Sequence, residues 1–321
     1  MDLVLKVKVL LLLVVFLLIT SCSSKNKVNK KDKVKETNIK SYNLKLEDFP
    51  KQSLIVNDTN FIVYLDISKL NEVSSFKKPL KFLLENYYLN NVTELYLTAS
   101  DIYKSQEFLF FIKNFQINLI NKENKKEVLG NRELIKTVKT DNQQFAYINF
   151  DNSAIYGDDA LVKELFHIYD NKVSAISSER YKLFTDSSFL KSKKALKLIF
   201  IPNKDYRDML IKHFENQVIL KPLFEDINYV LLELDINDAK SINISFVINS
   251  KKESIDLIFN FINTQKELLM TLNGSPYSNL DLNKVISSFD LLKNLKVNKI
   301  NNESLEFFIK VQESDIKKYI K

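Results

Sequence analysis

The spacing of apolar residues changes between two periods along the first half of the chain. Residues 61–67, FIVYLDI, are rich in β-branched and aromatic side chains and follow the turn-forming run 58–60. This pattern predicts a strand. From 76 to 88 the apolar positions recur every three or four residues, which predicts a helix. Ser68 is expected to cap the helical segment that follows the strand.

Two further strand-like runs, 93–102 and 106–115, are separated by a short polar stretch and predict a hairpin. The second half repeats this order. A strand is predicted at 196–202, Asn203 is a candidate cap for a helix at 205–214, and a second hairpin covers 227–250.

The repeat keeps a constant spacing at first and then lengthens. Matching Ser68 to Asn203 gives an offset of 135 residues, and matching Asp101 to Asp235 gives 134. A third pair of hairpins, 138–150 and 297–311, is offset by 159, so the second half carries extra residues. Each of these hairpins precedes a predicted terminal helix, and the extra residues fit a helical stretch within 253–295.

These patterns predict an α+β fold of two similar units, each an antiparallel sheet with helices packed on one face. The order β-α-β-β-α-β favours duplicated, ferredoxin-like split βαβ sandwiches. A single larger antiparallel sheet spanning both halves is the alternative. We expect the chain to divide into an N-terminal segment at 1–21, a second segment at 22–45, a first α+β unit at 46–182 and a second α+β unit at 183–321.

The N-terminus has the layout of a secretion signal. Lys6 and Lys8 precede the apolar run 9–20, which falls short of the roughly 20 residues that cross a bilayer. The run ends in Ile19-Thr20-Ser21-Cys22, a branched apolar residue, two small residues and a cysteine. An uncleaved signal anchor with an incidental cysteine is the alternative interpretation.

This tetrapeptide resembles the lipobox of bacterial lipoproteins. The resemblance implies cleavage before Cys22 and acyl chains such as palmitate on that residue, which is the one cysteine of the chain. Lipobox, lysine-rich stretch and composition together are similar to spirochaetal lipoproteins of the Borrelia type, whose functions are unknown. The resemblance implies attachment to the outer membrane, on either the surface or the periplasmic side, because Ser23 and Ser24 lack the aspartate that retains enteric lipoproteins at the inner membrane.

Charge is concentrated beside the proposed anchor. Residues 23–41 hold seven Lys against Asp32 and Glu36, so they carry +5 of the total of +7, and the signal carries +1. Everything from Tyr42 onward therefore carries +1, which does not suit a nucleic-acid-binding domain. We interpret residues 22–45 as a disordered tether that serves as a solvated spacer or touches anionic head groups.

No sequence motif for catalysis, a cofactor or a metal occurs, so none of these sites is predicted. The two histidines, His167 and His213, fall inside predicted helices, where a structural role is expected. Asp158-Asp159 precedes a predicted helix and is expected to cap it rather than bind a cation. Asp235 and Asp238 are expected to lie in a turn rather than in a calcium-binding loop.

Residues 255–262, IDLIFNFI, form an apolar stretch within a predicted helix. Such a stretch is either buried deeply or meets a partner or ligand, and deep burial is expected. The sequence as a whole favours a non-enzymatic binding or scaffolding lipoprotein of the bacterial envelope, with an envelope or host protein as the possible partner. The alternative is an envelope hydrolase whose acidic site is assembled only in the fold.

Overall fold

A computed structural model of the chain describes most of the residues from Gln52 onward. Cys22 and the proposed tether lie outside the described residues. The chain folds into two compact units, divided between Lys191 and Ser192. The described residues are 52–86, 89, 92–100, 108–113, 125–129, 132–139, 143–150, 153–169, 175–186, 193–213, 221–238, 241–272 and 295–314.

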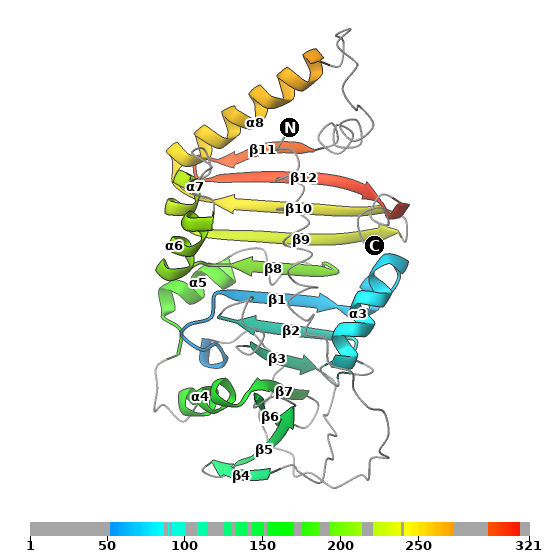
Figure 1. Cartoon of the computed structure of the whole chain (residues 1–321), viewed down its shortest axis with the longest axis vertical. Coiled ribbons are helices and arrows are strands. Elements are labelled where there is room, and N and C mark those ends of the chain that lie inside the picture. The colour runs from blue at the N-terminus through cyan, green and yellow to red at the C-terminus, as the bar shows by residue number, and fades with distance from the viewer. Residues whose placement is uncertain are drawn as a thin grey trace. The chain divides into compact units, whose positions relative to one another are not determined.

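The first unit contains seven of the described strands (Figure 1). In the order of the sheet these are β1-β2-β3-β7-β6-β5-β4, and each neighbouring pair is antiparallel. Its elements are η2 (Gln52–Leu54), β1 (Phe61–Asp66), α2 (Ile67–Leu70), α3 (Ser74–Asn86), β2 (Glu94–Ala99), β3 (Phe108–Lys113), β4 (Lys125–Leu129), β5 (Arg132–Lys139), β6 (Gln143–Phe150), β7 (Ser153–Asp158), α4 (Asp159–Tyr169) and α5 (Ser178–Asp186).

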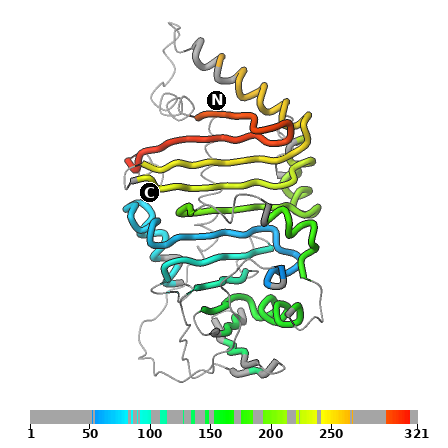
Figure 2. Tube along the Cα trace, turned by 180° about the vertical axis from the view of Figure 1, so that it is seen from behind, coloured from blue at the N-terminus to red at the C-terminus, as the bar shows by residue number. Residues whose placement is uncertain are grey.

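The second unit contains five described strands in the order β8-β9-β10-β12-β11, again all antiparallel. Figure 2 shows β9, β10 and β12 from behind as long neighbouring strands. Its elements are β8 (Leu196–Phe200), α6 (Lys204–His213), α7 (Lys221–Asp226), β9 (Tyr229–Asp238), β10 (Ser241–Asn249), α8 (Lys252–Leu272), β11 (Lys296–Asn301) and β12 (Ser304–Gln312).

The predicted ferredoxin-like sandwiches are wrong. In a split βαβ unit the strands on either side of the helix are parallel and a third strand lies between them. Here β1 and β2, which flank α2 and α3, pair directly and antiparallel from Phe61↔Ala99 to Asp66↔Glu94. The strands β8 and β9, on either side of α6 and α7, pair in the same way. The described strands therefore form extensive antiparallel sheet, and they do not form two duplicated sandwiches.

Many individual elements lie where the hydrophobic pattern predicts them. Strands occupy the predicted runs 61–67 and 196–202, and both predicted hairpins, β2–β3 and β9–β10, are present. Asn203 caps α6 as expected, because its Oδ1 accepts a hydrogen bond from Tyr206 N at 2.9 Å. Ser68 is not the cap of α2. Asp66 has that role instead, with its Oδ1 3.0 Å from Lys69 N.

The core of the first unit lies between α4 and the strands β3, β6 and β7. Phe110, Phe145 and Tyr156 are among its largest fully buried side chains, and the Tyr156 ring packs near each of the other two rings. Gly157 allows β7 to approach β3 closely, because a Cβ at this position would lie 2.1 Å from Phe108 O.

The expected deep burial of residues 255–262 is wrong for most of the stretch. These residues belong to α8, in which Ile255 and Ile258 are buried. Leu257 is 43% exposed, and Phe261 is half-buried. Within residues 255–262, α8 therefore covers its unit with one stripe rather than with its whole surface.

Candidate functional site

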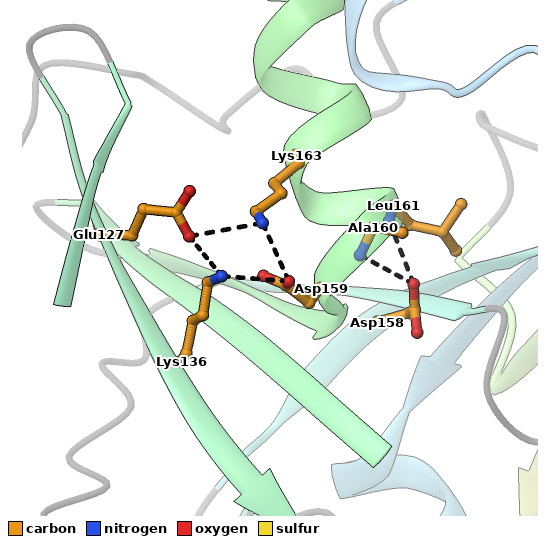
Figure 3. Close-up of polar contacts among 7 residues, drawn as sticks. All are labelled: Glu127, Lys136, Asp158, Asp159, Ala160, Leu161 and Lys163. Atoms are coloured by element: carbon orange, nitrogen blue, oxygen red, sulfur yellow. Dashed lines mark hydrogen bonds and ion pairs between the residues drawn. The ribbon is translucent and has the colours of Figure 1, made fainter. Parts of the chain in front are cut away.

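The aspartates at the start of α4 have two different structural roles (Figure 3). Asp158 Oδ1 accepts hydrogen bonds from Ala160 N at 3.0 Å and Leu161 N at 3.2 Å, which confirms the predicted cap. Asp159 instead contacts the ammonium groups of Lys136 at 3.4 Å and Lys163 at 3.2 Å.

Lys136 and Lys163 also contact the carboxylate of Glu127, the latter at 3.4 Å. Glu127, Lys136, Asp159 and Lys163 thus alternate in sign around a closed ion-pair ring that ties β4 and β5 to α4 (Figure 3). The hydrogen bond between Glu127 and Lys136 raises the pKa of the lysine and lowers the pKa of the glutamate. Two positive charges match two negative ones, so the ring has the chemistry of a structural clamp.

The other predicted residues stay apart from this ring. His167 is half-buried on α4 and His213 ends α6. Asp235 lies within β9 rather than in a turn, and it pairs with Lys194 at 2.8 Å. Asp238 is the last residue of the same strand. Within the described part of the chain, no three His, Cys, Asp or Glu residues gather as candidate metal ligands.

A different arrangement of charge lies on β1 and β2. Tyr64 is opposite Tyr96, and Asp66 is opposite Glu94. Ile67 N donates to Thr93 O at 2.7 Å, so Asp66 and Glu94 form a pair of the non-hydrogen-bonded type, in which cross-strand side chains lie closer together. We call Tyr64, Asp66, Glu94 and Tyr96 the tyrosine–carboxylate face.

The two tyrosines are in contact and are linked to one carboxylate. Their ring centroids are 4.9 Å apart with the planes inclined at 49°, and Tyr64 OH donates to Glu94 Oε2 at 2.8 Å. Burial, followed by the charge of Glu94, raises the pKa of Tyr96 to about 12. Burial also raises the pKa of Tyr64, with further contributions from Glu94 and Asp66. The face therefore carries a negative field that disfavours any additional anion.

One lysine lies beside this face and contacts one of its aromatic rings. The β2–β3 register places Lys113 beside Glu94, but its ammonium group lies over the Tyr96 ring, 5.6 Å from the centroid. Among the described residues, neither Asp66 nor Glu94 pairs with a lysine or arginine. Like charges directly opposite each other destabilise a sheet, so this pair is a candidate binding feature.

The tyrosine–carboxylate face is not predicted by the motifs of the sequence. The available signal was the alternation Tyr64–Asp66 on one strand and Glu94–Tyr96 on another, which places each pair on one face of its strand. Only the pairing of β1 with β2 shows that the carboxylates are opposite each other.

A second pair of carboxyl groups lies where the turn before β1 meets α4. Burial, followed by the charge of Asp58, raises the pKa of the Glu164 carboxyl group. Arg180 of α5 holds the same turn by donating to Asn57 O at 3.4 Å and to Asn60 Oδ1. This pair was also missed, because its members are more than 100 residues apart in the sequence.

The sequence matches no protein-family model and no curated protein. Solved structures of TP0453, a protein of the spirochaete Treponema, are similar to it. Crystal form III has a TM-score of 0.47 at 11% identity, covering 85% of this chain and 98% of that chain. Form I has a TM-score of 0.42 at 11% identity, covering 84% and 95%. Form IV has a TM-score of 0.44 at 9% identity, with the same coverage.

Proposed function

We propose that this chain is a lipid-anchored, non-enzymatic binding protein of the bacterial envelope. The observation that carries the proposal is the order of its N-terminal segments: two lysines, the apolar run 9–20, and then the lipobox-like Ile19–Cys22. Burying hydrocarbon gives about 0.8 kcal/mol per CH₂, so two or three acyl chains on Cys22 would anchor the protein stably. Within the described residues, no helix is long and apolar enough to span a bilayer.

The tyrosine–carboxylate face supports the binding part of the proposal. A purely structural sheet would favour opposite charges across β1 and β2, as in the ion-pair ring, because like charges in that position reduce stability. A like-charged pair beside two aromatic rings is accounted for if a ligand supplies the missing cation.

Metabolic labelling with an alkyne-bearing fatty acid tests the anchor. We expect the full chain to be labelled and Cys22→Ala to lose the label, while the matched control Ser24→Ala keeps it. Undiminished labelling of Cys22→Ala would refute the proposed lipid attachment.

Protease treatment of intact cells addresses the side of the outer membrane on which the protein lies. Loss of the protein from intact cells would indicate the surface and make a host partner accessible. Survival until the outer membrane is opened would indicate the periplasm and an envelope partner.

The Asp58–Glu164 pair supports a second candidate function, an envelope hydrolase. Glycoside hydrolysis uses two carboxyl groups, one of which is kept protonated by a raised pKa, and Glu164 has a raised pKa beside Asp58. Purified full chain should then cleave peptidoglycan, and Glu164→Gln should abolish cleavage. Equal product from the wild type and the variant would eliminate this function for the pair.

A further inference from the structure

We draw no further inference here: the strongest candidate, the apolar surface patch of Leu257 and Phe261 on α8 of the second unit, is partly exposed, but nothing in the described part of the chain shows what covers it.

Discussion

The ion-pair ring and the tyrosine–carboxylate face both lie in the first unit, and both bring two carboxylates together. In the ring each carboxylate contacts two lysines, so the charges cancel within the fold. On the face two carboxylates lie opposite each other, and the ammonium group of Lys113 lies over the Tyr96 ring. The difference is that the ring pairs each carboxylate with lysines, whereas the face brings two carboxylates directly opposite each other.

The largest expected effect comes from breaking the ring. Lys136→Met removes the ammonium group that contacts both Glu127 and Asp159, and Asp159 is only 13% exposed. We expect the free energy of unfolding of the first unit to fall by about 1–2 kcal/mol, measured by urea denaturation. Lys81→Met, which breaks an exposed pair at 3.8 Å, is the control and should change stability by less than about 0.5 kcal/mol. Equal losses in the two variants would contradict the role of the ring.

Neutralising the face should have the opposite sign. Asp66→Asn with Glu94→Gln removes the cross-strand repulsion while retaining hydrogen-bonding groups, so stability should rise by about 0.2–1 kcal/mol. The same urea titration at 1 M salt sharpens the comparison, because the Debye length falls from about 10 Å to about 3 Å and the gain should largely vanish. A loss of stability at low salt would show that the carboxylates are structural.

The smallest effect is expected from Glu164, a carboxylate outside both regions. Burial and the charge of Asp58 raise the pKa of Glu164 in the folded state, so the folded state binds its proton more tightly than the unfolded state. Stability from this group is therefore greatest below the unfolded pKa and declines as pH rises through the raised folded value. Glu164→Gln should flatten that decline in unfolding measurements between about pH 4 and pH 7. An unaltered pH profile would show that the group is solvated.

Local features of the sequence predicted many of the elements correctly. The alternation in FIVYLDI gave β1, the apolar spacing from Phe76 gave α3, and Asn203 and Asp158 cap their helices as expected. Cys22 is a local prediction as well, since a lipobox depends on adjacent residues alone, and it remains to be tested. All of these depend on periods or contacts within a few residues.

Pairing between distant segments could not be obtained in this way. The order of strands and helices is the same whether β1 and β2 are neighbours or are separated by a third strand, so the sandwich prediction failed on topology rather than on elements. The predicted deep burial of residues 255–262 in α8 failed for a related reason. An apolar sequence does not specify how much surface its unit offers for packing.

The sequence by itself predicted the approximate positions of many strands and helices, because hydrophobic period and capping act over one or two turns of chain. It also predicted the candidate anchor, which remains a prediction. Only the tertiary structure decided that Asp66 is opposite Glu94 and that Glu127 meets Lys163. Sheet register is set by the burial of whole faces, to which every paired strand contributes at once. Chemistry that depends on register therefore becomes visible only when the sheet is assembled.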